Sequence, residues 1–236
     1  MALVTSSTVW ASRTASVIDY NAPFTLSLWV KRTAAAASAS AVACILNSLY
    51  QREDLLEMLT STNVAALAVD AGGFADSAQH TLTLDTWIYL TIVREDVSTL
   101  RLYAGAVDTA ATLIGTATRN ITGRTAATTM TLGARRDDGT NPFVGQLDSA
   151  KLWTAGLTLA QVEAERLHEA AQLATGLWAA WALQANGTDA SGNSRNLTLA
   201  GTPSYASGPA INRGDALPPR SLLVVTPSLP FPYMEV

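Results

Sequence analysis

Residues 145–158 read G-Q-L-D-S-A-K-L-W-T-A-G-L-T. Residues 145–153 mix apolar and polar side chains in the manner of a β-strand, whose side chains point alternately to its two faces. Residues 154–158 contain a glycine and end in a threonine, which indicates a short loop that leads into a helix. Simple alternation predicts two faces, with Leu147, Ser149, Lys151 and Trp153 on one and Asp148, Ala150 and Leu152 on the other.

A helix is expected directly after this strand. Thr158 and Gln161 have the spacing of a capping box, in which two side chains satisfy backbone groups at the start of a helix. Apolar side chains then recur roughly on one side of residues 159–173, at Val162, Leu167 and Leu173. We therefore predict one helix over residues 159–173.

Strand patterns dominate the rest of the chain. The clearest are residues 24–31, F-T-L-S-L-W-V-K, and residues 87–94, W-I-Y-L-T-I-V-R, which alternate or are rich in aromatic and β-branched side chains. Turn signals recur about every ten residues, which favours an antiparallel sandwich over a parallel sheet. Further strands are predicted at residues 44–50, 55–60, 64–70, 81–84, 100–104 and 128–134, with a weaker edge strand within residues 7–12.

Composition narrows the classes of protein. Apolar residues make up 48% and charged residues 14% of the 236 positions, so the chain can bury a sizeable core. A net charge of −4 without a basic patch argues against a nucleic-acid partner. No apolar run reaches membrane-spanning length, so no membrane partner is expected. The N-terminus lacks the pattern of a secretory signal, and the lone Cys44 is expected to be a core residue.

The end of the chain changes character. Most of the nine prolines follow residue 202, and they interrupt apolar residues that cannot form a core of their own. Such a segment is expected to lie extended over a partner or over its own domain. We therefore predict a sandwich domain over residues 1–208 and an assembly tail over residues 209–236. The docking residues of this tail are predicted to be Leu222, Leu223, Val225, Leu229, Phe231 and Tyr233.

Two tryptophans mark the segment before this tail. Residues 176–183 read G-L-W-A-A-W-A-L and residues 188–199 read T-D-A-S-G-N-S-R-N-L-T-L. Trp178 and Trp181 are three residues apart, so in a regular strand they are expected to point to opposite faces.

Taken together, these patterns resemble a known family. The strings F-T-L-S-L-W-V-K, W-I-Y-L-T-I-V-R with L-R-L-Y-A-G, L-G-A-R, and G-Q-L-D-S-A-K-L-W with L-T-L-A-Q-V occur in the order and spacing of the laminin-G-like, concanavalin-A-like jelly-roll superfamily. The implied fold is an all-β antiparallel jelly-roll sandwich with one short helix and an extended Pro-rich tail. Residues 176–205 also resemble this family, in which such a segment usually comes first. They either close the same sandwich, which we favour, or begin a second unit.

The resemblance also implies a calcium site. The candidate ligands are Asp148, Asp189 and Asn193, with carbonyl groups of the loop around residues 191–192. Calcium takes six to eight oxygen ligands, which such residues can supply. Asp, Ser, Gly and Asn are equally common in ordinary turns, and this alternative stays open.

An enzyme is not expected. Glycosidases of this superfamily carry closely spaced acidic residues on one strand face, whereas residues 53–57, E-D-L-L-E, read as solvated edge charges. His168 has no catalytic partner at motif spacing and is interpreted as a surface or half-buried residue.

The leading hypothesis is a non-catalytic structural protein of a bacteriophage virion, either a capsid decoration or a tail-surface protein. Its tail would dock on other virion proteins or on copies of itself, at the virion surface. The alternative is a carbohydrate-binding lectin-like adhesion module, with or without calcium, that binds cell-surface glycans. Such a module would reach the outside by a route other than the general secretory one.

Overall fold

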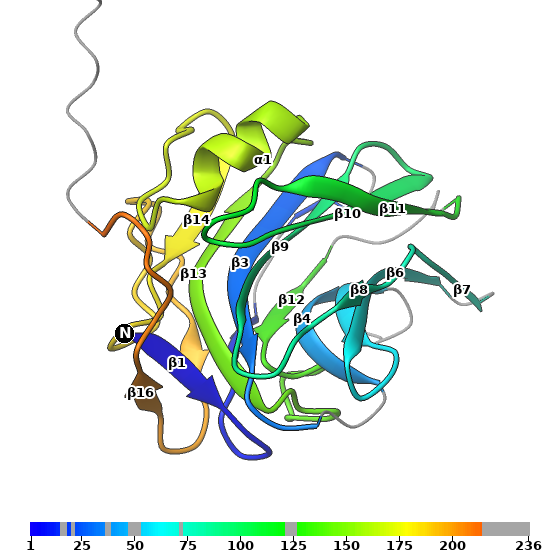
Figure 1. Ribbon diagram of the computed structural model, residues 1–236. Coiled ribbons are helices and arrows are strands. Elements are labelled where there is room, and N and C mark those ends of the chain that lie inside the picture. The colour runs from blue at the N-terminus through cyan, green and yellow to red at the C-terminus, as the bar shows by residue number, and fades with distance from the viewer. Residues whose placement is uncertain are drawn as a thin grey trace, which may run out of the picture.

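Two antiparallel sheets face each other in the computed structural model (Figure 1). The structure describes residues 1–14, 18–19, 22–35, 39–46, 53–70, 73–120 and 127–213. The predicted all-β antiparallel sandwich with one short helix is confirmed. The six predicted docking residues of the tail lie outside the described residues. No helix in the described part of the chain is long and apolar enough to cross a membrane.

The first sheet has the strand order β11-β10-β9-β3-β13-β1-β16, and β14 also pairs with β13. Along β13, the edge away from β3 is shared by β1 and then β14, so the two short strands extend one ladder. The strands of this sheet are β1 (Ala2–Thr5), β3 (Phe24–Arg32), β9 (Trp87–Arg94), β10 (Thr99–Gly105), β11 (Thr112–Thr118), β13 (Gly145–Trp153), β14 (Leu177–Trp181) and β16 (Ser204–Ala206).

The second sheet has the order β15-β2-β12-β4-β5-β6-β7, and β8 pairs with β6. Its strands are β2 (Ala11–Thr14), β4 (Ser40–Leu46), β5 (Glu53–Met58), β6 (Asn63–Asp70), β7 (Gly73–Asp76), β8 (His80–Thr81), β12 (Thr129–Leu132) and β15 (Thr198–Leu199).

The main core lies between the two sheets. Alternate residues of β3 and β9, such as Leu28 and Leu90, pack in one buried cluster with Ile45 of β4 and Leu56 of β5. Each side chain of this size stabilises the fold by about 1.5–3 kcal/mol when fully buried. Cys44 is also buried, but it belongs to a smaller cluster from the other face of the second sheet.

Residues 176–205 join this same sandwich. β14 pairs with β13, β15 pairs with β2 and β16 pairs with β1, so the segment closes both sheets. The prediction that Trp178 and Trp181 face opposite ways is wrong. The register of β14 shifts at Trp178, which adds one residue and resets the alternation. Both rings therefore belong to the main core cluster, with centroids 6.3 Å apart.

The helix α1 is shorter than predicted and spans Leu159–Arg166. Its capping box is confirmed, because the Thr158 hydroxyl accepts from the backbone N–H of Gln161 and the Gln161 side chain accepts from that of Thr158. The helix ends at Arg166, and a buried lysine of β13, Lys151, donates to the carbonyl oxygens of Glu165 and of His168 in the turn that follows. His168 therefore lies in the turn after α1, where it is half-buried.

Candidate functional site

The strand β13 changes its alternation once. Its register with β3 shifts between Asp148 and Lys151, and Ser149 adopts φ +49°, so the strand contains a β-bulge. Before the bulge, Leu147 faces the core and Asp148 faces outward. After it, Ala150 faces the core while Lys151 faces outward. The predicted pair of faces is therefore wrong, because it grouped Leu147 with Lys151.

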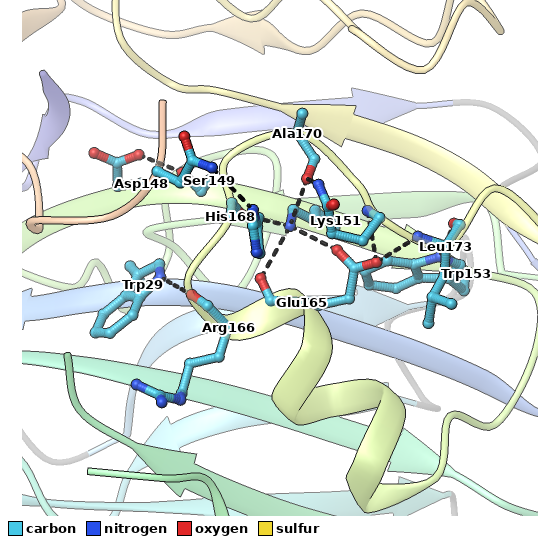
Figure 2. A network of polar contacts seen from close by, with 12 residues as sticks. Trp29, Asp148, Ser149, Lys151, Trp153, Glu165, Arg166, His168, Ala170 and Leu173 are labelled. Carbon is cyan, nitrogen blue, oxygen red and sulfur yellow. Dashed lines mark hydrogen bonds and ion pairs between the residues drawn. The ribbon is translucent and has the colours of Figure 1, made fainter. Parts of the chain in front are cut away.

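The outward side of the first sheet, here called its outer face, is half covered. Trp29, Tyr89 and Trp153 form a second buried cluster there, under α1 and its flanking residues. The indole N–H of Trp29 donates to the carbonyl of Arg166 at the end of α1 (2.9 Å), as Figure 2 shows. That of Trp153 donates to the carbonyl of Leu173 (3.0 Å). The two indoles therefore hold the helix and the following turn against the sheet.

A buried ion pair completes this attachment (Figure 2). Lys151 Nζ lies 2.7 Å from Glu165 Oε2, and both side chains are at most 1% exposed. The other carboxylate oxygen of Glu165 accepts from the backbone N–H groups of Gln172 (2.8 Å) and Leu173 (2.6 Å). Burial lowers the pKa of Lys151, and the negative charge of Glu165 opposes this effect. The pair is fully engaged in fixing the turn after α1.

Asp148, a predicted calcium ligand, instead binds an arginine. Its carboxylate lies 2.8 Å from Arg213 Nη2 and also accepts from the hydroxyl of Ser149 (2.7 Å). Burial raises the pKa of Asp148, and Arg213 opposes this effect. Arg213 also pairs with Glu169 (2.6 Å). These contacts fix residues 207–213, here called the strap, to the outer face.

The strap makes further contacts with the turn after α1. The backbone N–H of Asn212 donates to the carbonyl of Leu167 (2.8 Å), and the carbonyl of Asn212 accepts from the N–H of Glu169 (3.0 Å). Ile211 packs on the buried cluster of the outer face. Residues 209–213, which the sequence assigns to the tail, thus contact the sandwich.

Asp189, the second predicted ligand, organises its own loop. Its carboxylate accepts from the N–H groups of Ala180 (3.0 Å), Ser191 (2.9 Å) and Arg195 (2.9 Å), and from the hydroxyl of Ser191 (2.9 Å). Burial raises the pKa of Asp189, but these hydrogen bonds outweigh it and hold the pKa below its usual value. The amide nitrogen of Asn193 donates to the carbonyl groups of residues 177 and 178 (3.2 and 3.1 Å).

These contacts do not fit a calcium site. The carboxylate of Asp148 is neutralised by a cation, and that of Asp189 is surrounded by N–H and O–H donors. Within the described ranges, no group of three or more His, Cys, Asp or Glu side chains is placed to hold a metal ion. Calcium binding remains a prediction, and the turn alternative accounts for the contacts of the loop.

The other half of the outer face carries a row of side chains that the sequence analysis missed. Strand register places Trp87 beside Lys31, Lys31 beside Gln146, Gln146 beside Val4, and Val4 beside Ser204. The first four are half-buried and Ser204 is exposed. Lys31 Nζ lies 5.3 Å from the centre of the Trp87 ring, and the side-chain oxygen of Gln146 is buried and has no hydrogen-bond partner among the described residues. We call these five residues the open row.

The sequence holds little signal for this row. Only Trp87 stands out, as an aromatic residue at the start of a strong strand pattern. The five residues come from five strands, so only the pairing of those strands brings them together.

Several solved structures share this fold. A carbohydrate-binding protein, so described provisionally, from Bacteroides ovatus aligns with a TM-score of 0.59 and 14% identity, over 88% of this chain and 60% of its own. Domain 4 of the extracellular arabinanase of Geobacillus stearothermophilus, solved with arabinotriose, has a TM-score of 0.56 and 18% identity. The alignment covers 70% of this chain and 76% of that domain's chain. Tailspike protein 2 of a bacteriophage of Escherichia coli O157:H7 has a TM-score of 0.54 and 13% identity. The alignment covers 73% of this chain and 25% of the tailspike chain.

A search of curated proteins finds no match to the sequence. The family model described as the concanavalin A-like lectin/glucanases superfamily matches residues 5–163, which include both strong strand patterns and the capped start of α1. Both the two-sheet fold and this match confirm the resemblance drawn from the sequence. The chain belongs to the concanavalin A-like lectin/glucanases superfamily.

Proposed function

We propose that this chain is a non-catalytic lectin-like module that binds a neutral face of a glycan along the open row. The observation that carries the proposal is the register that lines up the half-buried side chains of Trp87, Lys31 and Gln146 on the outer face. An indole offers an apolar surface to the C–H face of a sugar ring, an ammonium donates to hydroxyl oxygens, and an amide can donate to or accept from hydroxyl groups. This combination of one aromatic and a few polar groups is typical of small-molecule sites.

The length of the row suits an oligosaccharide. Neighbouring strands lie about 4.8 Å apart, so the four steps from Trp87 to Ser204 cover about 19 Å. A single sugar would touch only two or three of the five residues. We therefore expect affinity to rise with chain length up to a short oligosaccharide.

The charges on the outer face support binding rather than hydrolysis. Glycoside hydrolysis needs two carboxyl groups about 5–10 Å apart that are free to donate and accept protons. The buried carboxylates of this face, Asp148 and Glu165, are each paired with a cation. The ligands named for two of the similar structures, a carbohydrate and arabinotriose, give further support at the level of the fold.

The test is a glycan array followed by calorimetry with the full chain. Trp87→Ala is expected to weaken binding of the best oligosaccharide at least tenfold, because it removes the aromatic surface. The matched control is Phe74→Ala, which removes a 64% exposed aromatic from β7 in the second sheet. An empty array, or equal affinities for wild type and Trp87→Ala, would refute the proposal. Repeating the titration with EDTA tests calcium, since a calcium-dependent lectin would lose its ligand.

A second proposal is that the module stands on the surface of a bacteriophage virion and that its tail attaches it there. The observation behind it is the strap, whose last residue, Arg213, is held on the sandwich by ion pairs with Asp148 and Glu169. The fold-level likeness to a tailspike protein gives further support.

Native mass spectrometry and light scattering can separate the two proposals. If only the full chain self-associates or binds a capsid or tail protein, and a chain ending at Gly214 does not, the virion proposal holds. If both chains are monodisperse monomers, the tail does not assemble, and the extracellular lectin remains.

A further inference from the structure

The loop after β14 is built to present an arginine. The carboxylate of Asp189 accepts from the backbone N–H of Arg195, and the backbone N–H of Asp189 donates to the side chain of Asn196 (2.9 Å). The indole N–H of Trp181 donates to the carbonyl of Arg195 (2.8 Å). Arg195 is thus held on both sides of its α-carbon, which limits the positions that its side chain can reach.

Two arginine side chains share one indole at this edge of the sandwich. The guanidinium carbon of Arg195 lies 4.4 Å from the centre of a Trp178 ring, and that of Arg13 on β2 lies 5.6 Å from it. Arg195 also donates to the carbonyl of Trp178, and Arg13 donates to the carbonyl of Asn196 (3.1 Å). Cation–π contacts of this kind fix a guanidinium group without neutralising its charge. We call Arg13 and Arg195 the arginine pair.

The arginine pair differs from several other described arginines, which each have a carboxylate within ion-pair distance. Arg101 is paired with Glu95, Arg166 with Glu163 and Arg213 with Asp148. In the described part of the chain, no carboxylate lies within ion-pair distance of either guanidinium of the arginine pair.

The pair also has hydrogen-bonding capacity to spare. The nearest acid in the loop, Asp189, directs its two oxygens at backbone N–H groups and a hydroxyl. Within the described ranges, the buried Nε of Arg13 has no hydrogen-bond partner. Both arginine side chains are half-exposed, so solvent reaches the pair.

An oxyanion would supply both the counter-ion and the hydrogen-bond acceptors that the arginine pair lacks among the described residues. Guanidinium groups bind carboxylate and sulfate oxygens through paired N–H donors, and such charge-assisted hydrogen bonds are about twice as strong as neutral ones. We propose that Arg13 and Arg195 bind the carboxylate or sulfate of an acidic glycan. This inference rests on the proposed function for the sugar part of the ligand, and it adds a requirement for negative charge at a place distinct from the open row.

The experiment compares charged and uncharged forms of one oligosaccharide on the full chain. Calorimetry is carried out with tetragalacturonate, its full methyl ester and a sulfated carrageenan tetrasaccharide, at low and at physiological salt. The expected result is at least tenfold tighter binding of one or both acidic forms than of the methyl ester. Added salt should narrow this preference, since the contact is between charges. The two acidic probes distinguish carboxylate from sulfate recognition.

Single-residue variants then test which residues cause the preference for acidic over esterified oligosaccharides. Arg13→Gln and Arg195→Gln should each reduce the ratio of acid to ester affinity about tenfold, whereas Arg195→Lys should keep part of it. Arg101→Gln is the matched control, because it removes the same charge from an exposed pair on a hairpin and should leave the ratio within twofold. Trp87→Ala should weaken all sugars and leave the ratio unchanged.

The outcomes separate this inference from the proposed function. Equal binding of acid and ester by the wild type, or an unchanged ratio in both glutamine variants, refutes the arginine site while the lectin function stands. The acid-to-ester ratio of the wild type needs no variant to fold, so a misfolded variant cannot hide the answer. If no form binds and the glycan array is empty, the proposed function fails and the acidic-glycan site fails with it.

Discussion

The buried pair of Lys151 and Glu165 gives a quantitative prediction for Lys151→Met. Methionine fills a similar volume but leaves the carboxylate of Glu165, which is 0% exposed, without its cation. Breaking a buried ion pair from one side costs about 3–5 kcal/mol, because the remaining charge stays out of water. For a domain of this size, each kcal/mol lowers Tm by about 2–4 °C, so we expect a loss of roughly 10 °C.

A double variant tests this reason for the loss. Glu165→Gln removes the stranded charge and keeps a carbonyl oxygen that can accept from the backbone N–H groups of Gln172 and Leu173. Lys151→Met with Glu165→Gln should therefore be more stable than Lys151→Met alone by about 2 kcal/mol, since a neutral pair avoids the buried charge.

Urea unfolding followed by the fluorescence of the six tryptophans measures both values. The control is Arg101→Met, whose pair with Glu95 is about one-third exposed and contributes only a few tenths of a kcal/mol in water. A Lys151→Met variant that loses less than about 1 kcal/mol would refute the reasoning about the stranded charge. So would a double variant no more stable than the single one.

Two more predictions follow from the outer face. Burial raises the pKa of Tyr89 above the ordinary tyrosine value of about 10. The contribution of Tyr89 to stability is therefore complete below about pH 10 and is lost as pH rises above that value. Tyr89→Phe should reduce the fall in the urea midpoint between about pH 9 and 11. Arg213→Gln leaves the buried Asp148 without its cation, so backbone hydrogen exchange of the strap should accelerate while that of β9 stays slow. Equal exchange of the strap in wild type and variant would show that the ion pair does not hold it.

Local signals made the fold predictable from the sequence. The strand predicted at residues 87–94 is β9, and that at residues 24–31 is β3 less one residue. The start of α1 was predictable because a capping box involves only residues three apart. Its end was not, because Lys151, which donates to the carbonyl groups of Glu165 and His168 around that end, belongs to a strand and not to the helical pattern. The edge strand β11 was missed because its threonine-rich sequence has little alternation.

Bulges limited what alternation could predict. Strict alternation of side-chain direction fails at Ser149 in β13 and at Trp178 in β14. Each register shift adds one residue to the strand, and no sequence pattern marks that residue here. A bulge depends on how a strand meets its neighbours, which lie far away in the chain. The side-chain directions beyond each bulge were therefore wrong, although the strand β13 itself was right.

The candidate ligands show the same limit in chemical form. The string D-A-S-G-N suits both calcium and a turn, and the sequence cannot say whether oxygens of Asp189 meet a metal or backbone N–H groups. The structure gives them N–H groups, and the consequence is a fixed Arg195. The open row has no local pattern at all, because its neighbours are joined only by strand register.

The bulge in β13 also accounts for how α1 and the strap are attached to the outer face. In an unbroken strand, Lys151 and Trp153 would share the side of Leu147 and enter the core, where an unpaired ammonium is strongly disfavoured. The extra residue turns both outward, beneath α1, while Asp148 stays outward to hold the strap. Both coverings, α1 with its turn and the strap, thus contact β13 beside the bulge. A rigid surface loses less entropy on binding, so this bracing of the outer face would favour glycan binding along the open row.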